Sequence, residues 1–184
     1  MKRFLLALFV TMSQLCNAQF VLTPSAGLMT EDGPFVIKRE ATEAENYYAA
    51  KKAVEQVVAG ANVGDQEYEK SFLVTSAFKE HKRLPGALIA SYWTVEYTLE
   101  IDCSDGQISI SFKELGPLAV ASKKGEVFGH VYPTTGRNSM IGNIMGAQYV
   151  FNSKGEVAKG CKKLKEIFED FANNLAKDIE NSLK

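Results

Sequence analysis

Residues 92–115, "YWTVEYTLEIDCSDGQISISFKEL", decide the fold, because large apolar side chains stand at every second position. The apolar set is Trp93, Val95, Tyr97, Leu99, Ile101 and Cys103. The intervening set is Tyr92, Thr94, Glu96, Thr98, Glu100 and Asp102. Successive side chains of a strand point to opposite faces of the sheet, so this pattern predicts a strand with one dry face and one wet face.

A turn and a second alternating run follow this strand. Asp105-Gly106 is a pair that favours a tight hairpin turn. Beyond the turn, the apolar residues Ile108, Ile110 and Phe112 alternate with Gln107, Ser109, Ser111 and Lys113. A polar half of this kind is typical of antiparallel sheets, whereas buried parallel strands are apolar on both faces. The stretch therefore predicts a long antiparallel hairpin.

The C-terminal segment can cover the dry face of that hairpin. Its apolar residues recur three or four positions apart, as Leu164, Ile167, Phe168, Phe171, Leu175, Ile179 and Leu183. At that spacing they form one stripe along an α-helix, and a helix of about 22 residues is ~33 Å long. Each large apolar side chain buried there contributes on the order of 1.5–3 kcal/mol. We therefore expect the hairpin and this helix to dominate the core.

The remaining segments complete an α+β domain over residues 35–184. Residues 35–40 and 70–81 are rich in strand-forming residues, and residues 147–158 predict a last strand with a polar turn. Thr42 and Glu45 have the spacing of a capping box, which predicts a helix over 43–59. Together these elements predict a twisted antiparallel sheet with two helices packed on one face.

Two other segments are less regular. Residues 19–34 contain Thr, Pro, Ser, Gly and Asp without clear periodicity, and we expect an extended N-terminal segment. Residues 116–147 hold six glycines and two prolines among short apolar fragments. They are compatible with a pair of strands joined by a loop, or with a lid. The glycine-rich part lacks the Gly-Lys-Ser/Thr ending of a phosphate-binding loop.

Residues 1–18 have the three parts of a secretory signal peptide. Lys2 and Arg3 give a basic start, Phe4 to Val10 is an apolar run too short to span a bilayer, and Ala18 offers a small residue at the cleavage point. We therefore expect export, to the periplasm or outer envelope. A lipid anchor at Cys16 is disfavoured because Leu15 precedes it where lipoprotein signals have a small residue.

Charge argues against nucleic acid as a partner. Removing residues 1–18 takes away two of the 21 basic residues and none of the 22 acidic ones, which leaves a net charge of −3. A nucleic-acid-binding domain would normally be basic. No later stretch of the sequence is apolar over about 18 residues, so we expect no transmembrane helix.

The order of these segments resembles that of the DUF4468 family of small exported Bacteroidetes proteins. The resemblance is carried by "EDGPFVIKREATEAENYYAAKKAV", "YTLEIDCSDGQISISF" and "QYVFNSKGEVAKGCKKLKEIFEDF", and it extends over most of residues 28–180. It implies a TBP-like fold, an arrangement close to a helix grip. The family has no established activity, so the resemblance implies no catalytic residue.

The sequence gives little sign of catalysis. Cys161 lies at a predicted helix start beside Lys162 and Lys163, and both features would lower the pKa of a thiol. An enzyme using Cys161 with His81 or His130 is one hypothesis, although nothing in the local motif is specific for it. Cys103 and Cys161 could pair in an oxidising compartment, but separate buried thiols are favoured. Metal-ligand spacings are absent, and no cofactor or metal site is predicted.

Two kinds of binding site remain, and they use opposite faces of the sheet. The polar face could bind an unknown protein or envelope component through Thr94, Glu96, Thr98, Ser109 and Ser111. The apolar face could instead hold a small apolar ligand under the final helix, against Tyr47, Trp93, Tyr97 and Phe112. Aromatic residues more often fill a core than line a pocket. The sequence therefore favours a non-enzymatic binding module, with a ligand carrier as the alternative.

Overall fold

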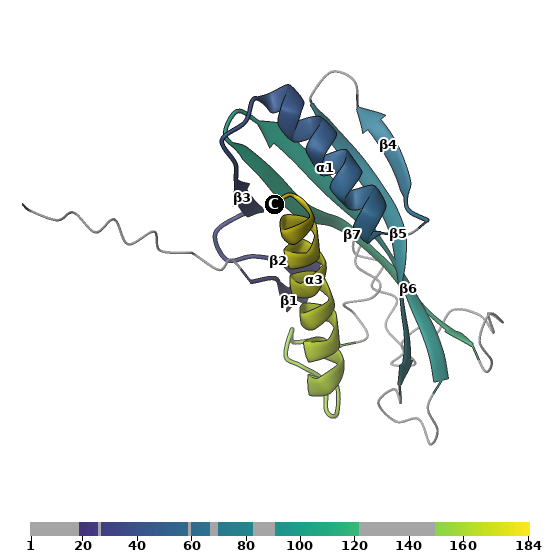
Figure 1. Ribbon diagram of the computed structural model, residues 1–184. Coiled ribbons are helices and arrows are strands. Elements are labelled where there is room, and N and C mark those ends of the chain that lie inside the picture. Colours follow the sequence, from purple (N-terminus) through teal and green to yellow (C-terminus); the bar gives the residue numbers. More distant parts are fainter. Residues whose placement is uncertain (1–18, 26, 59, 67–69, 83–90, 122–149) are drawn as a thin grey trace, which may run out of the picture.

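The computed structural model describes residues 19–184 apart from residues 26, 59, 67–69, 83–90 and 122–149. Its main element is an antiparallel five-stranded sheet of order β3-β7-β6-β5-β4. The strands are β3 (Phe35–Lys38), β4 (Asn62–Gln66), β5 (Ser71–Lys82), β6 (Ser91–Ser104) and β7 (Gln107–Ala121). Helices α1 (Glu43–Val57) and α3 (Lys162–Ser182) lie on the same side of this sheet (Figure 1). The predicted α+β fold class is confirmed.

The predicted hairpin is the centre of the sheet. β6 and β7 pair from Tyr92 with Ala121 to Ser104 with Gln107, around a turn at Asp105-Gly106. Gly106 has φ of 78°, in the left-handed region that glycine adopts without steric cost. All six predicted dry-face residues of β6 are at most 5% exposed. The two-sided character of this strand is therefore confirmed.

The second arm of the hairpin is longer and less regular than predicted. Register shifts interrupt the pairing between Val95 and Tyr97 and between Thr98 and Leu99. As a result, Leu115 pairs with Tyr97 and is buried, although it lies three positions after Phe112. A β-bulge of this kind restores the alternation after an extra residue. Residues 116–121 thus continue β7, and the rest of the segment predicted as a strand pair or lid lies outside the described residues.

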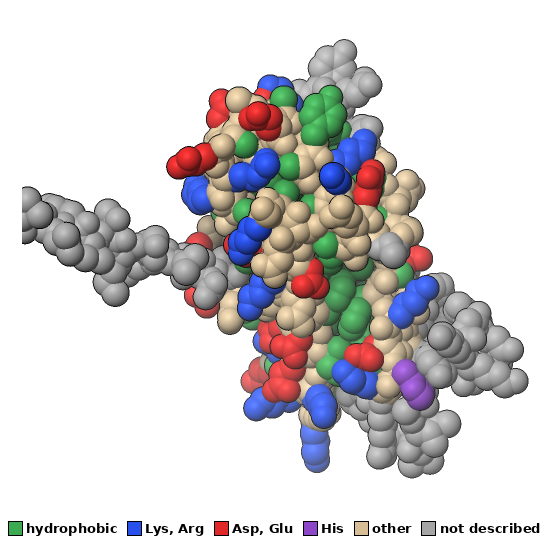
Figure 2. All heavy atoms as spheres, in the orientation of Figure 1, with side chains coloured by type: hydrophobic (Ala, Val, Ile, Leu, Met, Phe, Trp, Pro, Cys, Tyr) green, Lys and Arg blue, Asp and Glu red, His purple; other side chains and the backbone are tan. Residues whose placement is uncertain are grey.

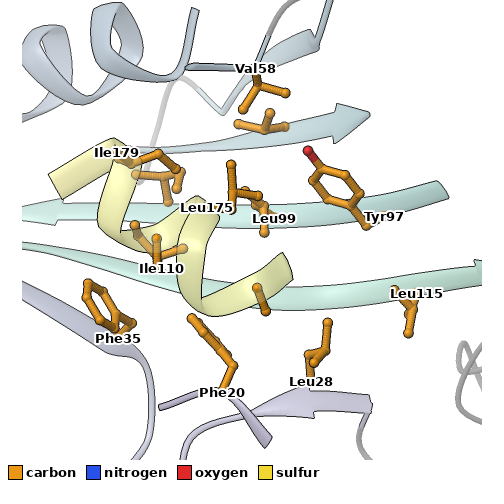
Figure 3. Close-up of a cluster of buried hydrophobic side chains, with 14 of the residues drawn as sticks. Phe20, Leu28, Phe35, Val58, Tyr97, Leu99, Ile110, Leu115, Leu175 and Ile179 are labelled. Atoms are coloured by element: carbon orange, nitrogen blue, oxygen red, sulfur yellow. The ribbon is translucent and has the colours of Figure 1, made fainter. Parts of the chain in front are cut away.

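Helix α3 covers the dry face with the stripe that the sequence predicts. Leu164, Phe168, Leu175 and Ile179 are at most 8% exposed, and the other members of the stripe are partly buried against the core. Figure 3 shows Leu175 and Ile179 above Leu99 and Ile110 of the hairpin. Helix α1 packs beside α3 on the same face and contributes Ala50, Ala53 and Val54 to the core.

The tip of the hairpin is fastened to the start of α1. Thr42 and Glu45 form the predicted capping box, and the observed helix ends two residues before the predicted end. The backbone N–H of Glu43 donates to Asp105 Oδ1 at 2.8 Å, so a hairpin side chain completes the helix cap. Glu43 also forms an ion pair with Lys70, which immediately precedes β5. The capping groups therefore hold three elements together.

A buried asparagine completes this connection. Asn46 is fully buried, and its Nδ2 donates to the carbonyl oxygens of Ser104 at 2.8 Å and Ala41 at 3.3 Å. Its Oδ1 accepts a hydrogen bond from Arg39 Nη1 at 3.1 Å. Both the Nδ2 group and the Oδ1 atom of Asn46 are thus hydrogen-bonded. A buried amide is tolerated when its polar atoms have such partners.

The N-terminal segment 19–34 is more ordered than an extended leader. It forms a two-stranded antiparallel sheet of β1 (Val21–Thr23) and β2 (Gly27–Met29). Asn173 of α3 binds both backbone groups of Phe20, accepting from its N–H at 2.8 Å and donating to its C=O at 3.1 Å. Phe20, Leu22 and Leu28 are at most 2% exposed. The N-terminal segment therefore contributes side chains to the hydrophobic core of the domain.

The predicted strand within residues 147–158 is wrong for the part that the structure describes. Residues 150–158 make only an isolated bridge between Phe151 and Val157, around the polar turn that the sequence does predict. Asn152 Oδ1 accepts from the backbone N–H groups of Lys154 and Glu156 at 2.8 and 3.1 Å. These local bonds close a tight loop before a ladder can extend.

Strand β4 is not among the elements predicted from the sequence. Its residues, Asn62 to Gln66, lack the alternation of large apolar residues that marks a half-buried strand. It pairs with the first residues of β5 and occupies the edge of the sheet, and its Val63 packs against the core. Backbone pairing therefore forms this strand, with little help from its side chains.

Replacing Asn46 should test the link between hairpin and helix. Asn46→Ala removes the side-chain donor to the Ser104 carbonyl and one of two donors to the Ala41 carbonyl, which keeps the N–H of Gly106, and we expect the free energy of unfolding to fall by about 1–3 kcal/mol. Urea unfolding followed by circular dichroism measures this loss. Asn174→Ala, at an exposed position of α3, makes the same change in helix propensity and should cost less than about 0.5 kcal/mol. Equal losses would contradict the assigned role of Asn46.

Replacing Phe20 should show that the N-terminal segment is part of the folding unit. Phe20 is 2% exposed, and its ring meets those of Phe35 and Phe112 at centroid distances of 6.1 and 5.1 Å. Phe20→Ala should lower the free energy of unfolding by about 3–5 kcal/mol. The control Tyr48→Ala removes a ring that is 72% exposed and should cost less than about 1 kcal/mol. A mild effect of Phe20→Ala would show that the segment is dispensable.

Candidate functional site

The four aromatic residues predicted to line a ligand site do not come together as one group. Tyr97 and Phe112 are neighbours, with ring centroids 5.9 Å apart, and both contact Phe171 of α3. Trp93 lies farther along β6 and contacts Phe168 at 5.9 Å. These three residues share the space under α3.

Tyr47 lies elsewhere, between α1 and the sheet. Its ring meets Phe72 edge-on at 5.5 Å and Tyr48 at 5.7 Å. It therefore supports the packing of α1 on β5, and it is not assembled with the other three in the structure.

Rings from the helix and from β5 occupy much of the space beside Trp93 and Tyr97. Phe78 stacks on Phe171 at 4.2 Å and meets Trp93 edge-on at 5.6 Å. Contacts of this kind stabilise a core beyond the area that they bury. Burial raises the pKa of the Tyr97 hydroxyl, and a hydrogen bond with Ser76 partly opposes that rise. The arrangement is that of a packed aromatic interior.

One polar atom in this interior is unsatisfied. Trp93 is 1% exposed, and its Nε1 has no hydrogen-bond partner in the part of the chain that the structure describes. A buried donor without an acceptor costs free energy and needs an explanation when it persists. An acceptor supplied by a bound molecule or water would satisfy it.

The two cysteines are buried thiols. Cys103 and Cys161 are 5% and 4% exposed. Burial, with the nearby Asp102 carboxylate, raises the pKa of Cys103 to about 11. Burial also raises the pKa of Cys161. The expectation that a helix start and two lysines activate Cys161 is therefore wrong, because desolvation of the thiolate outweighs them.

The other candidates for chemistry are not assembled into a site. His81 is exposed near the end of β5, and His130 lies outside the described residues. Among the side chains that the structure describes, no three His, Cys, Asp or Glu residues gather closely enough to hold a metal ion. Of the described helices, none is both long and apolar enough to cross a membrane.

The residues predicted as an interaction surface do share one face. Thr94, Glu96 and Thr98 alternate with buried residues of β6, and they point away from the helices. Ser109 and Ser111 of β7 stand opposite Asp102 and Glu100 of β6. We call this set, with the flanking Thr75, Glu100 and Lys113, the open face. In β5, Thr75, Ala77 and Lys79 pair with Thr98, Glu96 and Thr94, so the face extends across the three long strands.

Charge on the open face is partly balanced within the sheet. Lys113 Nζ lies 2.5 Å from Glu100 Oε2, between neighbouring strands. Hydrogen bonding to Glu100, with the negative charges of Glu100 and Asp102, raises the pKa of Lys113. Glu96 is exposed, and Gly116 faces it so closely that an added Cβ would lie 3.3 Å from Glu96 Cβ. A side chain at position 116 would therefore crowd this glutamate.

The burial of both thiols predicts slow modification in the folded protein. At pH 8 the raised pKa values keep Cys103 and Cys161 as neutral thiols, and only thiolates react with Ellman's reagent. We expect labelling of both to be at least 100-fold slower than in 6 M urea, where both should react fully. Fast labelling of native Cys161 would instead revive the enzyme hypothesis. The variant Cys161→Ala separates the contribution of Cys103.

Comparison with known proteins identifies the architecture. No protein-family model matches the sequence, and no curated protein is similar to it. A crystal structure of a DUF4468 family protein from Bacteroides ovatus is similar with a TM-score of 0.52 and 13% identity, over 82% of this chain and 85% of that one. A TBP-like protein from Parabacteroides distasonis is similar with a TM-score of 0.54 and 12% identity, over 81% and 89%. The resemblance predicted from the sequence is thus confirmed at the level of the fold, which is TBP-like.

Proposed function

We propose that this protein is an exported, non-enzymatic binding module of the cell envelope, and that its open face contacts a macromolecule. One observation carries the proposal: α1 and α3, the helices that the structure describes, both lie on one side of the sheet, and neither covers the hydroxyl-rich side (Figure 1). Export rests on the signal-peptide pattern of residues 1–18.

The size of the open face suits a partner of ordinary dimensions. β6 has 14 residues, so at a rise of about 3.4 Å it is roughly 48 Å long. The three long strands of the open face, each about 4.8 Å wide in the sheet, give a width of roughly 14 Å. The resulting area is of the order of the roughly 800 Å² that one protein contributes to a standard interface.

The chemistry of the open face also favours reversible recognition. Thr94, Thr98 and Ser111 have short side chains that lose little rotamer freedom when a partner covers them. Their hydroxyls can donate and accept, so they can match backbone or sugar groups alike. Glu96 adds an exposed negative charge, which favours a partner with a complementary positive group.

A small apolar ligand is the second candidate, and one observation favours it. The buried Nε1 of Trp93 lacks an acceptor among the described residues. Native mass spectrometry of protein purified from its own host would show a bound mass of several hundred daltons. If only the mass of the unliganded protein were seen, the ligand hypothesis would be rejected, and the interior would contain the packed aromatic rings alone.

Alanine replacement across the open face should abolish partner capture. The variant carries Thr94→Ala, Glu96→Ala, Thr98→Ala, Ser109→Ala and Ser111→Ala, and cross-linking followed by pull-down from the host envelope is the measurement. We expect loss of the captured partner with the thermal midpoint lowered by only a few degrees, because these side chains are not buried.

The control variant changes exposed helical residues on the opposite side, as Lys52→Ala, Glu55→Ala, Asn174→Ala and Asp178→Ala. It should capture the partner as the unmodified protein does. Equal capture by both variants would reject the open face as the binding surface. Loss of capture by both would assign the binding to another region.

A further inference from the structure

Lysine is concentrated where the chain enters α3. Between residues 152 and 165 there are five lysines, and the acidic residue in that stretch is Glu156. We call Lys154, Lys159, Lys162 and Lys163, with the exposed Val157, the basic end. In Figure 2 Lys and Arg side chains (blue) project from the lower end of the molecule, next to Asp and Glu side chains (red).

The backbone that carries the basic end is held in place. The Phe151–Val157 bridge closes the loop, and the N–H of Ala158 donates to the carbonyl of Val150 at 2.8 Å. At Gly155 an added Cβ would lie 3.4 Å from Pro24, so the loop rests on the turn between β1 and β2. The lysines therefore project from a defined surface.

The positive charge of the basic end is only partly neutralised by ion pairs. Glu166 lies 4.0 Å from Lys162 and Glu169 pairs with Lys165, whereas Glu156 accepts a hydrogen bond from the neutral Asn152 Nδ2 at 3.0 Å and keeps its negative charge. By contrast, the exposed ammonium groups of Lys154, Lys159 and Lys163 make no ion pair with any described residue.

Helix stability does not account for these charges. The first turn of α3 has no acidic residue, whereas α1 begins with Glu43 and Glu45. The amino end of a helix carries partial positive charge, so lysines there are unfavourable to the fold. A benefit to binding would explain why they stand there.

We infer that the basic end binds an anionic membrane surface. Lysine ammonium groups are compact charges without a fixed fork geometry, so they suit a laterally mobile layer of lipid phosphates. Val157 is 39% exposed among them and can enter the headgroup region, as apolar residues do beside basic clusters. The absence of arginine and of exposed aromatic rings from residues 150–165 argues against recognition of bases in nucleic acid.

Vesicle sedimentation tests this inference on the purified protein that begins at Gln19. The probes are vesicles of phosphatidylcholine alone and vesicles with 30% phosphatidylglycerol, at 50 and 500 mM NaCl. We expect binding only to the anionic vesicles, and at least a tenfold loss at high salt, because exposed charges are screened beyond a few ångströms. Each lysine near the surface should contribute about fivefold to partitioning.

Matched variants identify the surface. Lys154→Gln, Lys159→Gln and Lys163→Gln together should weaken binding at least tenfold. The control Lys52→Gln, Lys177→Gln and Lys184→Gln makes the same change in net charge at exposed sites elsewhere and should weaken it less than threefold. Val157→Ser should weaken binding several-fold and leave its salt dependence unchanged.

Three results would overturn the inference. One is no sedimentation of the unmodified protein with anionic vesicles at 50 mM NaCl. Another is an equal loss in the two triple variants, which would reduce the effect to net charge. The third is retention on heparin without vesicle binding, which would assign the basic end to a soluble polyanion. The open face takes no part in this experiment, so failure here leaves the proposed function untouched.

Discussion

The structure depends on sealing the dry side of the β6–β7 hairpin. Six alternate side chains of β6 are almost wholly buried, and water would contact all of them if the helices were absent. Burial of each large side chain is worth on the order of 1.5–3 kcal/mol, so leaving this side open would cost more than the usual net stability of a domain. Helix α3 is long enough to cover it, and the aromatic contacts of Phe168 and Phe171 fix where the helix lies.

Polar groups at the hairpin tip position helix α1 on the dry side of the hairpin. Asp105 caps α1, and Asn46 returns a hydrogen bond to Ser104, so the turn and the helix start are positioned by each other. At the other side of the core, Asn173 binds Phe20 by both backbone groups, much as a neighbouring strand would. Side-chain amides thus join segments that are more than 50 residues apart in sequence, which an apolar interior cannot do with the same directionality.

Features that depend on one continuous segment could be predicted from the sequence, whereas features that depend on contacts between distant segments could not. The period of two in residues 92–112 and the stripe from Leu164 to Leu183 are properties of single segments, and both predictions are confirmed. Strand β4 and the burial of Phe20 depend on partners far away in the chain, so no local pattern announces them. The register shift between Thr98 and Leu99 cannot be predicted for the same reason, because it depends on how two strands pair. Cys161 shows a further limit: adjacent lysines were visible in the sequence, but the burial that dominates its pKa was not.

Function is harder to predict than the fold, because the packing of the core does not determine which residues stand on the surface. The dry side is constrained by packing, and nearly every residue there has a structural reason to be apolar. On the open face and at the basic end that constraint is absent, since Thr94, Glu96 and Lys163 contribute little to the core. Residues free of a folding role are where a functional pressure can act, and lysines at the amino end of α3 even act against the local helix electrostatics. The two surfaces lie on different parts of the molecule, so one protein could bind a macromolecular partner through its sheet while its basic end contacts a lipid surface.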